Sequence, residues 1–116
     1  MFEIIFYETE DSHKPVIDFL NSLDTKMRVK ALREIQLLKE FGYTLREPNS
    51  KALQDGLFEL RIKQGNNISR IIYFFFINNK IVMTNGFMKK TQKTPKAEIE
   101  KAKKYKDDFE RRNKNG

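Results

Sequence analysis

Charged and apolar residues alternate along positions 57–63, Leu-Phe-Glu-Leu-Arg-Ile-Lys, and this segment holds the first candidates for chemistry. A period of two is typical of a β-strand, whose successive side chains point to opposite faces of the sheet. Glu59, Arg61 and Lys63 would therefore lie together on one face, while the apolar residues between them face the core. Arginine offers forked N–H donors that match the oxygens of a phosphate or carboxylate group, so this face is a candidate anion site.

Further cations are expected on the same face. Arg70 is the one charged residue of the apolar run 68–77, and burying a lone guanidinium costs free energy unless it is solvated or paired. We therefore expect Arg70 to share the face of Arg61. Lys89 and Lys90 end the next apolar run and bring positive charge to the same edge. Two more lysines complete the predicted cluster: Lys51 and Lys63.

Ion pairing inside the protein would explain this pattern without any ligand. Arg61 would then pair with Glu59 or with an acid of the last helix, and Arg70 would form a structural salt bridge. However, neighbouring strands bring several cations to a face on which Glu59 is the lone acid. The mutual repulsion of these cations favours an anionic ligand.

The composition excludes several other kinds of site. The 116 residues contain no Cys, which removes disulfides, thiolate zinc sites and cysteine nucleophiles. Because His13 is the single His, His-rich metal sites and any mechanism that needs two histidines are excluded. We expect His13 to be a surface or capping residue. No apolar run reaches ~18 residues, so no membrane span is expected. The N-terminal residues do not resemble a signal peptide, and we expect a cytoplasmic protein.

The net charge of +7 is unevenly distributed along the chain. Residues 1–58 hold 8 Lys and Arg against 10 Asp and Glu, whereas residues 59–116 hold 15 against 6. A strongly basic half attracts phosphate and raises encounter rates with nucleic acid. A solvated lysine face on a helix, or an acidic protein partner, would account for the same charge.

The first part of the chain is predicted to form a strand and a helical hairpin. An aromatic and β-branched run over 2–7 indicates the strand. A short amphipathic helix is expected over about 14–23, and Asp24 or Thr25 can cap a longer one. Gly42 stands where a glycine ends a helix. The apolar positions of the longer helix are Met27, Ala31, Leu32, Ile35, Leu38 and Phe41.

The second part is predicted to be mostly sheet. Residues 43–56 are expected to be mostly loop. Polar connections containing Gly and Asn, typical of hairpins, separate three β-rich runs, 57–63, 68–77 and 80–89. Thr94 is predicted to cap a last helix with Pro95 at its first position, and 111–116 to be a frayed tail. We therefore predict one small α+β domain over residues 1–116, in which a meander antiparallel sheet packs on the helical hairpin and a C-terminal helix follows.

These residues resemble a known group of proteins. The segments 57–62, 69–74 and 86–95 are similar to HigB toxins of the RelE/ParE superfamily, in particular to its phage-derived host-growth-inhibition branch. The likeness covers nearly the whole chain and includes Pro15-Val16, 50–53 and 98–102. It implies a RelE-like fold, although that superfamily fold hosts both ribonucleases and gyrase poisons.

The resemblance implies a type II toxin that enters the ribosomal A site and cleaves the mRNA there, without a metal or other cofactor. Its implied partners are the ribosome with its mRNA and a helix-turn-helix antitoxin of the HigA kind. The complex with the antitoxin is expected to be of higher order, such as a heterotetramer, and to bind operator DNA through the antitoxin. No membrane is involved.

The family's catalytic cations match Arg61, Arg70 and Lys90. RNA carries its own nucleophile, the 2′-hydroxyl, so the arginines would clamp the phosphate while Lys90 or Lys89 would stabilise or protonate the leaving 5′-oxygen. Glu59, where relatives commonly carry a basic residue, is a candidate base for the 2′-hydroxyl or, alternatively, an ion-pair partner that orients Arg61. Nucleic-acid contacts are expected from four lysines: Lys51, Lys63, Lys89 and Lys93.

Two other functions stay open. A ParE-like toxin would inhibit DNA gyrase by protein contact, although Arg61, Arg70 and Lys90 together argue against it because such contact needs no phosphate clamp. A non-catalytic RNA-binding module would use the same basic face without cleaving its ligand.

Overall fold

A computed structural model describes residues 1–90 and 93–114. Thr91 and Gln92, within the segment that carries the resemblance, and residues 115–116 of the predicted tail lie outside the described residues. The helices and strands are β1 (Glu3–Phe6), α1 (Pro15–Ser22), α2 (Thr25–Phe41), β2 (Ser50–Ala52), β3 (Phe58–Gln64), β4 (Asn67–Phe76), β5 (Lys80–Met88) and α3 (Lys96–Arg112), with a 3-10 turn at Gly42–Thr44.

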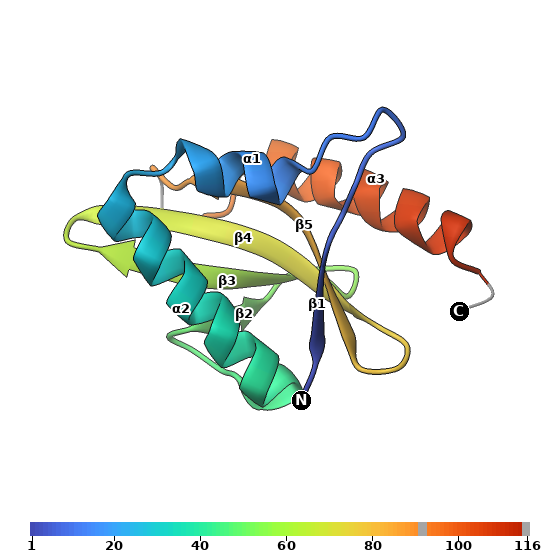
Figure 1. Ribbon diagram of the computed structural model, residues 1–116, viewed down its shortest axis with the longest axis horizontal. Coiled ribbons are helices and arrows are strands. Elements are labelled where there is room, and N and C mark those ends of the chain that lie inside the picture. Colours follow the sequence, from blue (N-terminus) through green and yellow to red (C-terminus); the bar gives the residue numbers. More distant parts are fainter. Residues whose placement is uncertain (91–92, 115–116) are drawn as a thin grey trace.

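A five-stranded sheet in the order β1-β5-β4-β3-β2 forms the centre of the protein (Figure 1). The neighbouring pairs from β2 to β5 are antiparallel, which confirms the predicted meander. β1 is the exception, because it runs parallel to β5 at the edge of the sheet. Both predicted hairpins are present: Gly65 and Asn66 join β3 to β4, while Asn78 and Asn79 adopt left-handed backbone conformations between β4 and β5.

β2 lies in the segment that was predicted to be mostly loop, and for these three residues the prediction was wrong. Ser50 pairs with Leu60 and Ala52 pairs with Phe58. The Ser50 side chain is buried and shares a hydrogen bond with the hydroxyl of Tyr73 on β4. A strand of this length is too short to show an alternation of apolar and polar residues in the sequence. Its position is set by these contacts with β3 and β4.

The helical hairpin forms where it was predicted. Asp24 caps α2 by accepting a hydrogen bond from the Met27 N–H at 2.9 Å. Gly42 ends the helix with a positive φ of 46°, and the Phe2 ring lies where a Cβ would stand. Leu32 and Phe41, predicted on the buried face, are each 50% exposed because they flank the stripe that faces the sheet.

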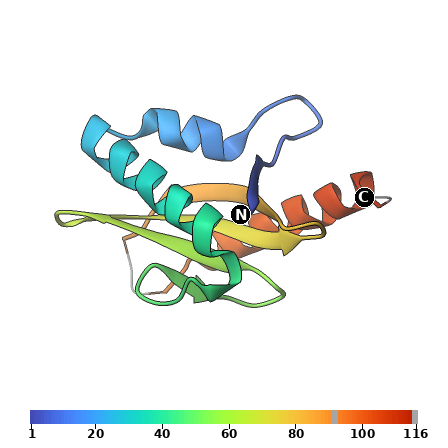
Figure 2. The same cartoon turned by 60° about the horizontal axis from the view of Figure 1, so that its bottom comes forward.

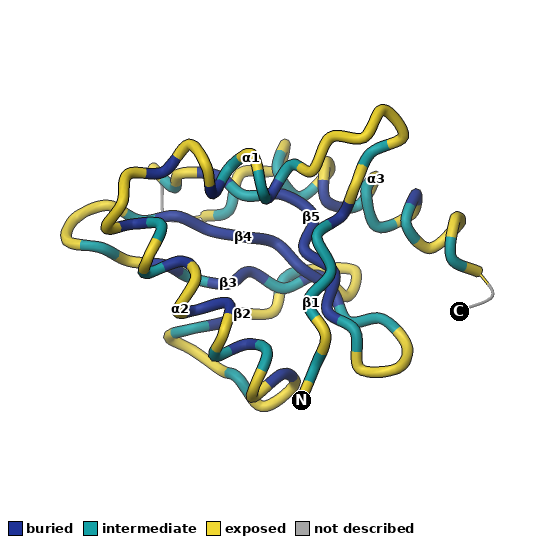
Figure 3. The backbone as a smooth tube through the Cα atoms, viewed as in Figure 1, coloured by how far each residue is buried: buried dark blue, intermediate teal, exposed yellow. Residues whose placement is uncertain are grey.

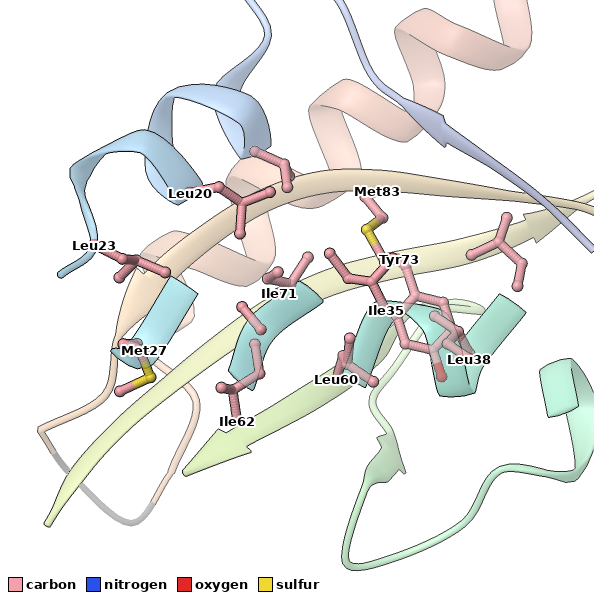
Figure 4. Close-up of a cluster of buried hydrophobic side chains, with 13 residues drawn as sticks. Leu20, Leu23, Met27, Ile35, Leu38, Leu60, Ile62, Ile71, Tyr73 and Met83 are labelled. Carbon is pink, nitrogen blue, oxygen red and sulfur yellow. The ribbon is translucent and has the colours of Figure 1, made fainter. Parts of the chain in front are cut away.

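The main core lies between this hairpin and one face of the sheet (Figure 4). Leucine, isoleucine and methionine side chains of α1 and α2 pack on alternate residues of the central strands. As predicted, Leu60 and Ile62 of β3 are buried in this core, with Phe58 packed against it. β4 is buried over most of its length (Figure 3), which identifies it as the central strand of the domain.

The opposite face of the sheet carries a second, smaller core under α3. Figure 2 shows α1 and α2 on one side of the sheet and α3 on the other. Ala102 of α3 is fully buried in a cluster with Ile72, Phe74 and Val82. The face that was expected to be open is therefore covered by α3 where these apolar residues lie, and the charged residues of β3 and β4 occupy the remainder.

The start of α3 differs from the prediction. Pro95 is the N-cap, without a side-chain capping bond, and the helix begins at Lys96. Thr94 is not the cap, because its hydroxyl donates a hydrogen bond to Glu59 on β3. At the other end the helix continues to Arg112, so the first two residues of the predicted frayed tail are helical.

Candidate active site

Strand register brings the predicted charged residues into adjacent rows on the α3 side of the sheet. Arg61 on β3 stands directly opposite Arg70 on β4. In the row on one side, Lys51 on β2 pairs with Glu59 on β3. In the row on the other side, Lys63 pairs with Ile68, whose carbonyl accepts the Lys89 N–H at 2.8 Å. We call the basic residues of this region the cation cluster: Lys51, Arg61, Lys63, Arg70 and Lys89.

Glu59 is the carboxylate of this cluster, and its side chain is 1% exposed. One of its oxygens accepts a hydrogen bond from the Arg61 Nε at 3.2 Å and lies 3.6 Å from the Arg70 Nε. The other oxygen accepts the Thr94 hydroxyl. Both oxygens are thus engaged by protein groups. This geometry matches the alternative role of Glu59, as a partner that orients the arginines.

Arg70 is the buried member of the arginine pair, with 8% of the residue exposed. Burial lowers the pKa of its guanidinium, the Glu59 carboxylate opposes that shift, and Arg61 adds to it. Arg70 Nη1 donates to the Ser69 carbonyl at 3.0 Å, whereas its Nε lies within ion-pair range of Glu59 without a hydrogen bond in the described structure. Because this Nε is buried, N–H donors for an anion can come only from the Nη nitrogens of the side chain.

Lys89 belongs to the cluster and Lys90 lies at its margin. Lys89 continues the ladder of β5 and is half-buried. Desolvation lowers the pKa of its ammonium, Glu59 raises it, and Arg70, Arg61 and Lys51 lower it further. Lys90 is exposed, one residue beyond. The geometry therefore favours Lys89 over Lys90 as the lysine beside the arginines.

The remaining predicted contacts are at the surface. Lys51 and Lys63 are exposed at the edge of the cluster. Lys93 is exposed before α3. The lysines of α3 contribute less free positive charge than their number suggests, because several contact acids: Lys101 with Glu98 at 3.8 Å, Lys103 with Asp55 at 2.9 Å and Lys106 with Glu110 at 4.0 Å.

A hollow of about 530 Å³ opens beside the cation cluster, between α2 and the end of β3. Arg61, Arg70 and Lys63 line it on the sheet side, and Lys30 lines it on the α2 side. Glu34 of α2 is 4% exposed there and accepts a hydrogen bond from the Asn49 side chain at 2.8 Å. These α2 and loop residues were missed in the sequence, since only tertiary packing brings them beside β3.

Elsewhere in the described part of the chain, no comparable cluster of predicted residues is present. His13 is exposed in the loop between β1 and α1, with Asp11 at 3.8 Å, as expected for a surface residue. In residues 1–90 and 93–114, no three His, Asp or Glu side chains gather in a way that can hold a metal ion. None of the helices in these ranges has the length and apolar composition needed to cross a bilayer.

Comparison with known protein families identifies the family of this chain. The family of phage-derived Gp49-like proteins (DUF891) matches residues 18–107. The chain belongs to the Gp49-like family. This match covers the second part of α1, all of α2, the whole of β2 to β5 and most of α3, and so includes every member of the cation cluster. No curated protein matches the chain.

The Gp49-like family belongs to the RelE/HigB-like toxins of toxin–antitoxin systems. The compact α+β domain, with its five-stranded and mostly antiparallel sheet, is consistent with a small RelE-like fold. Membership of a toxin–antitoxin family implies an antitoxin as partner.

Proposed function

We propose that this Gp49-like protein is a HigB-type toxin that stops translation by cleaving mRNA in the ribosomal A site, without a metal. The observation that carries the proposal is the direct pairing of Arg61 with Arg70, joined by the buried carboxylate of Glu59. Like charges placed directly opposite in a sheet destabilise it, so the pair needs a compensating anion. Glu59 supplies one, and a phosphodiester can share the N–H donors that remain.

In this proposal the arginines hold the non-bridging oxygens of one phosphate. The 2′-hydroxyl attacks the adjacent phosphorus and its proton leaves to solvent; a P–O2′ bond forms and the P–O5′ bond breaks. The products are a 2′,3′-cyclic phosphate and a 5′-hydroxyl. Negative charge grows on the phosphoryl oxygens in the transition state, where fixed guanidinium groups stabilise it more than in the ground state.

Lys89 is the proposed acid for the leaving 5′-oxygen. An ordinary lysine pKa of ~10.4 is too high for efficient proton donation near neutral pH. Desolvation and the neighbouring cations lower the pKa of Lys89, which brings it closer to the pH at which the protein would act. Lys51, Lys63 and Lys93 are proposed to contact RNA phosphates, and Lys90 is proposed to stabilise the leaving group from the margin of the cluster.

Glu59 is proposed to position the arginines instead of taking a proton from the 2′-hydroxyl. Its burial and its three partners support this role, because a general base has to reach the proton that it removes. The antitoxin is proposed to be of the HigA helix-turn-helix kind, in a higher-order complex that binds operator DNA through the antitoxin.

The test is primer extension on a defined mRNA incubated with the antitoxin-free protein, with and without translating ribosomes, and with EDTA in the control reactions on free RNA. Cuts within codons only when ribosomes are present would support the proposal. Cuts on free RNA would make the protein a self-sufficient nuclease. No cuts in either condition, from folded protein, would contradict the proposal, and a DNA-supercoiling assay would then examine gyrase inhibition.

A further inference from the structure

The hollow beside the cation cluster contains more positive charge than one phosphodiester requires. Lys30 and Lys63 line it from opposite walls, in addition to Arg61 and Arg70. Its volume of about 530 Å³ exceeds the space that a phosphate group occupies. Glu34, the acid at its wall, is buried and already engaged by Asn49 and by Lys30 at 3.7 Å. The hollow is therefore a cationic recess continuous with the proposed catalytic arginines.

Asn49 is fixed in one orientation by Glu34. A carboxylate only accepts hydrogen bonds, so the amide nitrogen of Asn49 must face it, as the 2.8 Å contact shows. The Oδ1 atom and the second N–H of that amide are then turned away from Glu34. Asn49 is itself held against the catalytic strand, because its carbonyl accepts the Arg61 N–H at 2.8 Å. The amide therefore keeps one acceptor and one donor for a ligand, the two kinds of group that the edges of nucleobases pair with.

We propose that this hollow is a subsite for the nucleotide next to the phosphodiester held by Arg61 and Arg70. Lys30 and Lys63 contact the backbone phosphate of that nucleotide, and the Asn49 amide hydrogen-bonds its base. This inference rests on the proposed function, and it assigns to α2 and the loop before β2 a part in binding the RNA strand. Apolar surface from Pro48 and Ile68 at the same hollow offers contact to the base.

The subsite can be tested with uncleavable RNA. The ¹⁵N-labelled full chain is titrated with a 2′-O-methyl dinucleotide and with trinucleotides extended by one residue on the 5′ or the 3′ side, and amide shifts are followed. One of the two trinucleotides should bind about fivefold more tightly than the dinucleotide, a gain of about 1 kcal/mol. The base of its added nucleotide should shift the side-chain NH₂ signals of Asn49. An added nucleotide that lacks its base should leave these signals unchanged.

Variants separate the subsite from general charge effects. K30M should remove most of the gain for the trinucleotide and leave dinucleotide affinity within about twofold. K26M, which removes an exposed lysine in the first turn of α2, is the matched control and should keep the gain. Thermal unfolding of each variant shows that the loss does not come from a damaged fold, and the Asn49 signals are read in the unmutated protein.

The outcomes distinguish the two proposals. If the dinucleotide binds and neither extension adds affinity, or if the Asn49 signals stay in place, the subsite is wrong while the proposed function stands. A gain that survives in the K30M variant contradicts the subsite as well. If none of the three RNAs binds, the subsite on the free protein is contradicted, while cleavage on the ribosome is decided separately by the primer-extension test.

Discussion

Thr94, two residues before α3 begins, donates a hydrogen bond from its hydroxyl to Glu59 near the start of β3. The same carboxylate meets Arg61 and Arg70. The segment that leads into α3 is therefore connected to the arginine pair through Glu59. The side chain of Asn85 on β5 supports this attachment by donating to the carboxylate of Glu98 at 2.9 Å and to its carbonyl at 3.2 Å.

Removing either arginine should stop RNA cleavage. Arg61→Ala and Arg70→Ala should each lower the rate by about 100- to 1000-fold, the usual effect of deleting one group that stabilises a developing oxyanion. The rate of codon cleavage on translating ribosomes measures this. Arg33→Ala, at an exposed position of α2, is the matched control. A fully toxic Arg61→Ala variant would contradict the assignment.

Glu59→Gln should separate positioning from proton transfer. Without the carboxylate charge the paired arginines repel each other, and cleavage should slow by about 10- to 100-fold, as for outer-sphere residues of other sites. If Glu59 only positions the arginines, the pH–rate profiles of the variant and of the unmutated protein should have the same shape on the acid side. An acid limb that is present in the unmutated protein and absent from the variant would instead identify Glu59 as the general base.

Thr94→Val should weaken the connection between α3 and β3. A hydrogen bond to a charged group contributes about 1.5–3 kcal/mol, so the free energy of unfolding should fall by about that amount. Urea denaturation measures the difference. Thr94→Ser keeps the hydroxyl and should stay close to the unmutated protein. A Thr94→Val variant as stable as the unmutated protein would contradict the role of this hydrogen bond, and a loss confined to Thr94→Ser would assign the stability to the methyl group.

Lys89→Ala should impair cleavage more than Lys90→Ala, by about 100-fold if Lys89 acts as the acid. An acid works only while protonated, so the rate should fall as the pH rises through the Lys89 pKa, which is lowered from 10.5. Lys89→Arg should lose this alkaline limb because arginine keeps its proton. A larger loss with Lys90→Ala would place the exposed lysine in the site.

Tyr7 should make stability sensitive to alkaline pH. Its hydroxyl donates to Asp108 at 2.6 Å, and burial together with this carboxylate raises its pKa from 10.0 to about 12. The folded state therefore favours the neutral phenol. Its contribution to stability is complete below pH ~10 and is lost between pH ~10 and ~12. Urea denaturation across this range should show a steeper fall for the unmutated protein than for Tyr7→Phe, and equal slopes would contradict the assignment.

The parts of the fold that could be predicted are those encoded by local signals. Gly65 with Asn66, and Asn78 with Asn79, marked the hairpins because few other residues adopt the required backbone conformations. Those hairpins in turn place Arg61 beside Arg70 on the predicted face. Gly42 ended α2 for a similar reason.

The parts that could not be predicted depend on contacts between distant segments. Thr94 before Pro95 has the local pattern of a helix cap, but a hydrogen bond to Glu59 takes its hydroxyl away. Asn49 and Glu34 lie far apart in sequence and meet only when α2 packs beside β3. The residue pattern within one segment contains no information on contacts between distant segments. The hollow was therefore missed, whereas the strand residues of the cation cluster were found.

The parallel pairing of β1 with β5 has a consequence for synthesis. The first strand to leave the ribosome finds its neighbour in the sheet among the later segments, with Glu3 beside Lys80. Long-range pairing of this kind closes late, because the chain entropy of a long loop must be overcome before the contact forms. We therefore expect a nascent chain to stay without its finished sheet until β5 has emerged from the ribosome, so that the cation cluster, which Lys89 completes, assembles only after that point.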